Sequence, residues 1–247
     1  MPKSVAEPAP ALRGPKASGA LAETLRERIL AGEFAVGTPL PPERELVSQT
    51  QNSRTTVREA LRVLEAQGLV SIRTGRSGGA FVQALGEESV ASSAELLIRG
   101  RQIRMRTLLE TRESLEPQCA RLAATYRTDD DLERLEAANH AIGQQSNTLA
   151  DFLQANLDWH MAVAAASHNE LMSGFMLALS RAIYAGTDNS GFVDDEVRAT
   201  TVKAHRTITQ AIRDRDPAAA VRRMERHVHS YAEALLEVDE RTEVEID

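Results

Sequence analysis

Apolar residues recur at helical spacing along most of the chain, beginning with segment 20–31. This predicted helix ends at Gly32. Two prolines then precede a second, short helix from about Glu43, and proline at a helix start loses no hydrogen bond. A third helix is predicted over 53–67, with Ser53 as its N-cap and Gly68 after its last turn. Its apolar stripe consists of Val57, Leu61 and Leu64.

The pattern changes after the third helix to two short runs with strand character. The runs LVSIR and GGAFVQ flank the glycine-rich turn TGRSGG, which predicts a β-hairpin. Three helices followed by a hairpin are typical of a winged helix-turn-helix, which we place at residues 18–84. Residues 1–17 are rich in Pro, Ala and Gly, and we predict a disordered tail there.

Everything beyond a predicted linker at 85–89 is helical in pattern. Short connections between long helices predict an antiparallel bundle, which we place at residues 90–240. Thr128 and Asp131 have capping-box spacing, and Asp216 precedes a proline in the manner of an N-cap. The expected fold is therefore mainly α: an N-terminal winged helix-turn-helix and a C-terminal all-α antiparallel bundle. The expected bundle helices are 90–99, 102–125, 129–146, 149–167, 169–187, 194–214 and 217–238.

Composition and charge narrow the class of protein. The formal net charge is −7 over 247 residues, yet residues 18–84 hold eight arginines against seven glutamates. Residues 18–84 are thus less acidic than the rest of the chain. This difference suggests that only this part of the protein binds an anionic polymer. Cys119 is the only cysteine, which excludes an internal disulfide and a cysteine-based zinc finger. No apolar run reaches the roughly 18 residues of a membrane span, so we expect a cytoplasmic protein without a membrane partner.

Arginines form a face on the third predicted helix. Arg54, Arg58 and Arg62 step by four residues, and the N-terminal part of such a helix can enter the major groove. Arginine suits guanine edges and phosphates, while Ser53 and Thr55 can reach phosphates. Considered alone, the same helix is equally compatible with a solvated face on which arginines pair with glutamates.

The order of residues resembles a known family. The stretch LPPERELVSQTQNSRTTVREALRVLEAQGLVSIRTGRSGGAFV is similar to the GntR family of bacterial regulators, across roughly residues 20–83. The resemblance implies a DNA-binding regulator rather than an enzyme. It also implies the DNA contacts, which are Arg44, Ser53, Arg54, Thr55, Arg58 and Gly75. Because each chain carries one small DNA-binding domain, we expect a homodimer that binds a pseudo-palindromic site in double-stranded DNA.

The helical half resembles the FadR-type branch of this family, whose effector domain is called FCD. The segments LLETRESLEPQCARLAA, NLDWHMAVAAASHN, VKAHRTITQAIRDRDPAAA and MERHV carry the resemblance. Many members bind a divalent metal through one Asp or Asn and three His. The resemblance places these ligands at Asn156, His160, His205 and His227.

Helical spacing supports the same metal site independently. Asn156 and His160 lie four residues apart on one face, and His205 and His227 each fall within an apolar stripe that points inward. Three inward imidazoles suit Zn²⁺, Ni²⁺ or a similar cation. A neutral amide at 156 is a weaker ligand than the carboxylate of many relatives. We expect His140, His168 and His229 at the surface and Trp159 in the core.

Arg112 is the candidate effector ligand. It lies on the stripe of Leu108 and Leu115, where a charge needs a partner. One interpretation is an i,i+4 pair with Glu116, and the other is a fork for an effector carboxylate. An arginine and a metal facing one cavity favour a small organic acid.

Three functions remain to be compared. The first is a ligand-responsive regulator that senses a small carboxylate. The second is a FadR-type regulator that binds an acyl-CoA without metal, which the three histidines disfavour. The third is a metal-dependent hydrolase, but no H-E-x-x-H motif is present and no glutamate shares the His160 face.

Overall fold

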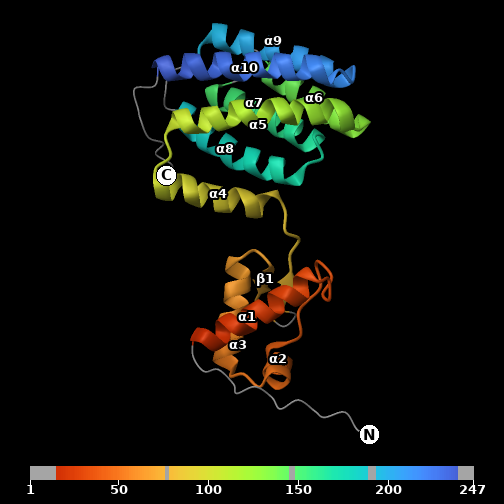
Figure 1. Cartoon of the computed structure of the whole chain (residues 1–247), viewed down its shortest axis with the longest axis vertical. Coiled ribbons are helices and arrows are strands. Elements are labelled where there is room, and N and C mark those ends of the chain that lie inside the picture. The colour runs from red at the N-terminus through yellow and green to blue at the C-terminus, as the bar shows by residue number, and fades with distance from the viewer. Residues whose placement is uncertain (1–14, 76–77, 145–147, 189–192, 239–247) are drawn as a thin grey trace. The chain divides into compact units, whose positions relative to one another are not determined.

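The computed structural model describes residues 15–75, 78–144, 148–188 and 193–238. The chain divides into two compact units, Met1–Leu85 and Gly86–Asp247 (Figure 1). Residues 1–14 of the tail predicted over 1–17 lie outside the described residues, whereas residues 15–17 are not a tail but belong to the first helix. The mainly helical fold predicted from the sequence is confirmed: the described residues form ten helices and one two-stranded sheet.

The first unit is built on three helices: α1 (Pro15–Leu30), α2 (Glu43–Thr50) and α3 (Arg54–Ala66). Ser53 caps α3 as predicted, because its Oγ accepts a hydrogen bond of 3.1 Å from the Thr56 N–H. Helix α1 packs on α3, and the predicted apolar stripe of α3 is buried. This core fixes the polar face of α3 toward solvent.

The wing is the antiparallel hairpin of β1 (Val70–Arg73) and β2 (Gly79–Val82). Val70 pairs with Val82 and Arg73 with Gly79. The turn depends on glycine at two positions. Gly75 has φ 108°, and a Cβ on Gly78 would lie 2.5 Å from the carbonyl oxygen of Arg73.

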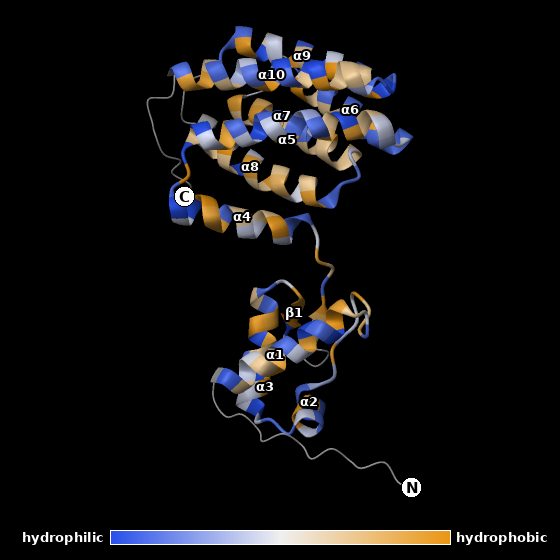
Figure 2. Ribbon diagram, in the orientation of Figure 1, coloured by the Kyte–Doolittle hydropathy of each residue, from blue (hydrophilic) through white to orange (hydrophobic). Residues whose placement is uncertain are grey.

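The second unit is a helical bundle in which α9 and α10 lie at one edge and α4 at the opposite edge (Figure 1). Helix α5 contacts α7, α8, α9 and α10, so it forms the centre of the bundle. Figure 2 shows hydrophilic and hydrophobic residues interleaved along α9 and α10, as the stripes of the sequence predict. The helices are α4 (Glu87–Arg101), α5 (Met105–Tyr126), α6 (Asp129–Ile142), α7 (Leu149–Ala166), α8 (Glu170–Asp188), α9 (Asp195–Arg213) and α10 (Pro217–Val238).

Capping residues set several helix ends in the bundle. The capping box of Thr128 and Asp131 is present, and Asp216 Oδ1 accepts from the Ala219 N–H at 2.9 Å. Helix α4 begins at Glu87, so part of the segment expected as linker at 85–89 is helical. Helix α6 ends at Ile142, earlier than expected, because Gly143 follows it.

The interior of the second unit is apolar around a few buried polar groups. Trp159 is fully buried and donates to Thr209 Oγ1 at 3.1 Å. Cys119 is also buried, and burial raises the pKa of its thiol to about 12. Among the described residues, no helix combines the length and the apolar character needed to cross a bilayer.

Candidate functional site

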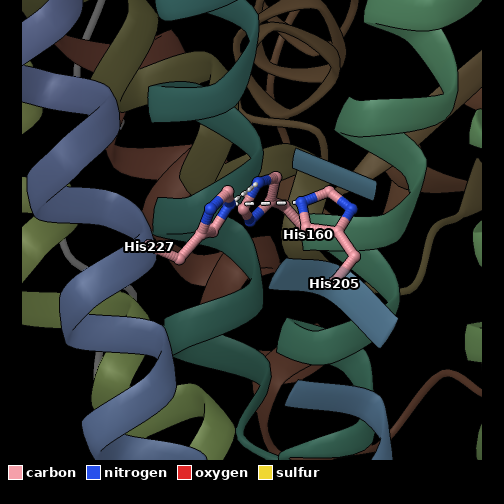
Figure 3. Close-up of side chains that lie close together, drawn as sticks. All are labelled: His160, His205 and His227. Carbon is pink, nitrogen blue, oxygen red and sulfur yellow. Dashed lines mark hydrogen bonds between the residues drawn. The ribbon is translucent and has the colours of Figure 1, made fainter. Parts of the chain in front are cut away.

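Three buried histidines from three helices meet inside the second unit. His160 lies on α7, His205 on α9 and His227 on α10, and their rings face one another in Figure 3. His205 Nε2 lies 3.1 Å from His227 Nε2, which lies 3.5 Å from His160 Nε2. One ring nitrogen from each residue falls within 4.8 Å of the others. The stripes that predicted inward histidines at 205 and 227 are thus correct.

Two of the three nitrogen separations match those of a tetrahedral cation. Imidazole binds Zn²⁺ at about 2.0–2.1 Å, so two ligands of a tetrahedral ion lie about 3.3 Å apart. The Nε2 separations from His227 to His205 and to His160, 3.1 and 3.5 Å, lie on either side of that value. The residues present therefore fit a borderline divalent metal in type and in position.

The electrostatics of the cluster favour neutral imidazoles. Burial lowers the pKa of His205 and of His227 well below the ordinary value, and the neighbouring histidines and Arg112 lower both further. Burial also lowers the pKa of His160, although the Glu116 carboxylate acts in the opposite direction. A neutral ring offers the lone pair that a metal needs, so no proton has to leave before a metal binds at pH 7.

Glu116 orients His160 within the cluster. Its Oε2 lies 2.7 Å from His160 Nδ1, which directs His160 Nε2 toward the other two rings. A carboxylate behind a histidine is the usual outer partner of a metal ligand, because it fixes the ring and increases its basicity. Sequence reasoning considered Glu116 only as a partner for Arg112, since a contact with residue 160 has no signature in local spacing.

Arg112 joins the same network. Its Nε donates to Glu116 Oε1, as the i,i+4 interpretation expects. Its Nη2 lies 2.6 Å from Nε2 and 3.3 Å from Nδ1 of His160. Closeness to both ring nitrogens places this group beside the imidazole, not beyond Nε2 along its lone pair. The guanidinium also lies 5.1 Å from the ring centre of Tyr231.

Asn156 lies one turn before His160 and lines the same small cavity. Arg112, His160 and Tyr231 also line this cavity, whose volume of about 30 Å³ is close to that of one water molecule. Asp158 is exposed and accepts from Gln154, in keeping with a position on the other side of the helix. The cavity beside Arg112 is therefore too small for an organic acid in this conformation.

A larger groove opens between α9 and α10. Its volume is about 450 Å³, within the usual range for small-molecule sites. Thr201, His227 and Tyr231 line it, so the groove reaches the histidine cluster. The charged residues of its lining are Lys203, Arg223, Arg226 and Glu196. Sequence reasoning missed this groove, because its lining comes from two helices whose register only the fold defines.

The proposed DNA contacts lie on the exposed face of the first unit. Five of the proposed contacts are exposed: Arg44 in the first turn of α2, and Ser53, Arg54, Thr55 and Arg58 at or near the N-terminal end of α3. Arg58 pairs with Glu43 of α2, while Arg62, further along α3, pairs with Glu59. The alternative of arginines that pair with glutamates therefore applies to two of the three: Arg62 pairs on its own helix, and Arg58 pairs with a residue of α2.

The wing lies beside this arginine face. A groove of about 730 Å³ between α3 and the hairpin is lined by Arg58, Arg62, Thr74 and Gly75, among others. Arg73, the last residue of β1 before the turn, stacks on Phe81 of β2 at 4.2 Å. The remaining histidines follow expectation, since His140, His168 and His229 are exposed.

A DNA-reading head and a helical unit with an internal polar cluster define a class of protein, the ligand-responsive transcription regulators. The comparisons agree with that class. Residues 17–82 match the family model "Bacterial regulatory proteins, gntR family", and residues 107–230 match the FCD domain. The chain belongs to the gntR family and carries an FCD domain.

Several transcription regulators align with this chain over most of the length of both proteins. The galactonate operon transcriptional repressor of Escherichia coli K12 is 29% identical over 80% of this chain and 87% of its own. The transcriptional repressor NanR of Enterobacter sp. 638 is 30% identical over 87% and 84%. A solved GntR structure from Streptococcus agalactiae has a TM-score of 0.67 at 29% identity, covering 88% of this chain and 99% of that one. The relatives and the fold are those of transcription regulators, not of enzymes.

Proposed function

We propose that this regulator binds a pseudo-palindromic DNA site as a homodimer and responds to a small carboxylate next to a bound divalent metal. The observation that carries the metal and effector part is the convergence of three buried, neutral imidazoles beneath a groove with basic lining. The exposed arginines of α3 carry the DNA part. When bound, the metal would supply a positive centre that attracts an anion.

For DNA binding, Arg44, Arg54 and Arg58 would contact bases and phosphates, with Ser53, Thr55 and Gly75 assisting. Arg54→Ala and Arg58→Ala should each cost about 1–3 kcal/mol at a contacted base. The measurement is fluorescence anisotropy on DNA that the wild type selects from a random library. Arg62→Ala is the matched control, because Arg62 pairs within α3 and should affect affinity less. Full affinity in the Arg54→Ala, Arg58→Ala double variant would exclude this face.

For the metal, His160, His205 and His227 would be the ligands, assisted by Asn156. Elemental analysis of untagged protein, purified without chelator and then loaded with Zn²⁺ or Ni²⁺, should find about one equivalent per chain. His160→Ala should lose the metal, whereas His229→Ala, an exposed histidine of α10, should retain it. Asn156→Asp should bind the metal more tightly, because a carboxylate adds charge. Less than about a tenth of an equivalent in the loaded wild type would contradict the site.

For the effector, the α9–α10 groove is the site with enough volume for an organic acid. Three threonines and Ser230 line it together with its basic residues, so we propose a hydroxylated carboxylate as the class. The relative from E. coli is named for the galactonate operon, and galactonate belongs to this class. Arg112 would pair with the anion through its fork once the Glu116 contact rearranges.

The effector test uses a panel of sugar acids, hydroxy acids and dicarboxylates. DNA affinity should change by about 5–150-fold with the correct compound. Arg112→Lys keeps the charge and loses the fork, so it should weaken the response while DNA binding without effector stays intact. Lys203→Gln tests the groove independently of the buried network. If neither variant alters the response to a compound that acts on the wild type, the effector binds elsewhere.

The dimer is tested by sedimentation of the full chain, with and without DNA. We expect a mass of two chains and a DNA site with two half-sites, since a two-fold protein matches a two-fold site. A monomer that binds a single half-site with full specificity would contradict this part of the proposal.

A further inference from the structure

Arg58 differs from the other arginines of the DNA face in how it is held. Its Nε lies 2.9 and 3.1 Å from the two carboxylate oxygens of Glu43. Glu43 is the first residue of α2, and Arg58 lies in the second turn of α3. The pair therefore links the two helices of the helix-turn-helix through side chains 15 positions apart.

The contact leaves a specific edge of the guanidinium facing outward. A guanidinium is planar, and its five N–H donors form a rigid fork. Because Glu43 engages Nε, the two Nη groups are the edge that remains for another partner. Arg62 shows the opposite arrangement, since Glu59 accepts from its Nη1. Arg44 and Arg54 form no ion pair with any residue that the structure describes.

Stability does not account for the pair, because both side chains are exposed. The Arg58 side chain has 64% of its surface accessible and that of Glu43 has 40%. Exposed ion pairs contribute little to folding. A carboxylate on a surface that meets phosphates also weakens binding to any DNA sequence. Glu43 therefore lowers the affinity for DNA of any sequence and adds little to the stability of the fold. Its position is consistent instead with a role in discriminating between DNA sequences.

We infer that Glu43 is a positioning residue that holds the Arg58 guanidinium with its Nη edge toward a base. The inference rests on the proposed contact between Arg58 and DNA. Both Nη groups then meet the O6 and N7 acceptors of a guanine end-on, which is the commonest specific contact in the major groove. Without Glu43 the Arg58 side chain would still attract phosphates, but it would populate several rotamers, and only some of them would direct its Nη groups toward the base.

The test separates discrimination from general affinity. The probes are the duplex selected by the wild type from a random library, variants of it with one base pair replaced, and a scrambled duplex. Glu43→Ala should lower the ratio of specific to non-specific affinity by about tenfold, a size typical of one good base contact. Affinity for the scrambled duplex should stay equal or rise. Glu43→Gln should fall between Glu43→Ala and the wild type, because an amide oxygen still accepts from Nε.

Two controls make the result specific to Arg58. Glu45→Ala removes the same charge from the same helix and should leave the ratio unchanged, because Gln49 is the one side-chain donor to Glu45 among the residues that the structure describes. In an Arg58→Ala background, Glu43→Ala should have no further effect on the ratio. The base pair at which Glu43→Ala relaxes the preference should be the one that Arg58→Ala relaxes.

Four results would overturn the inference. An unchanged ratio in Glu43→Ala, or an equal loss in Glu45→Ala, would show that the pair does not position Arg58. A full loss in the Arg58→Ala background would show that Glu43 acts through another group. A wild type that selects no sequence would remove the proposed DNA function itself, whereas the other three results leave that function standing.

Discussion

Replacing the buried carboxylate of Glu116 by an amide should strongly destabilise the second unit. Glu116→Gln preserves shape but leaves the Arg112 guanidinium buried without a countercharge. Arg112 is 5% exposed and Glu116 2% exposed. Breaking a buried pair in this way typically costs about 3–5 kcal/mol. Burial alone would raise the pKa of Glu116, but Arg112 and His160 lower it from 4.5 to about 2, which corresponds to about 3 kcal/mol in favour of the charged form.

The assay is urea unfolding at pH 7 followed by the emission of Trp159. This is the only tryptophan of the chain and is fully buried in the second unit, so its signal reports that unit alone. A chelator in the buffer removes any contribution from bound metal. The matched control is Glu136→Gln, which breaks the exposed pair with Arg213 and should cost no more than about 1 kcal/mol.

A double variant separates the charge from the shape. Arg112→Met combined with Glu116→Gln removes both charges, so it should be more stable than Glu116→Gln alone. If Glu116→Gln costs less than about 1 kcal/mol, or if the double variant is the less stable of the two, the reasoning about a buried and mutually dependent pair is refuted.

Three further predictions follow from local geometry. Gly78→Ala should distort the wing and weaken DNA binding, because the new Cβ would meet the Arg73 carbonyl oxygen; anisotropy on the selected duplex measures this, and normal affinity would contradict it. Gly19→Ala, in the exposed part of α1 with open space around it, should instead stabilise the first unit by about 0.5–1 kcal/mol in thermal unfolding, and a loss would contradict it. Asp131→Ala should cost about 0.5–2 kcal/mol at pH 7, because the capping box with Thr128 is lost. Burial raises the pKa of Asp131, but hydrogen bonds from Thr128 outweigh it and lower the pKa overall, so this stabilisation is complete above about pH 4 and falls as the pH drops through the folded-state pKa; an undiminished difference from wild type well below that range would contradict it.

Periodicity and caps predicted much of the architecture. The apolar stripes placed His205 and His227 inside the bundle, because a helical repeat fixes the face on which a residue lies. Ser53 and Thr128 were identifiable as caps because their function depends on neighbours within three residues. Such local determinants are present in the sequence whatever the tertiary structure.

Contacts between elements were not predictable in the same way. The bond from Glu116 to His160 and that from Glu43 to Arg58 depend on how two helices are packed, and sequence spacing carries no record of it. Helix α4 was expected to start later, because Gly86 and the exposed Leu96 and Leu97 obscure its apolar face. The groove proposed for the effector is likewise formed by residues of both α9 and α10, so it also depends on how two helices are packed.

The lone thiol of the chain has a practical consequence. Cys119 is 1% exposed, and burial keeps its pKa near 12, so it is almost entirely un-ionised at pH 8, where maleimide and methanethiosulfonate reagents attack thiolates. New cysteines at Ser48 in the first unit and Ser114 in the second, both exposed, would accept spin labels without removal of the native residue. Distances between the two labels, recorded before and after DNA is added, would then show how the reading head and the sensing bundle are arranged in each state.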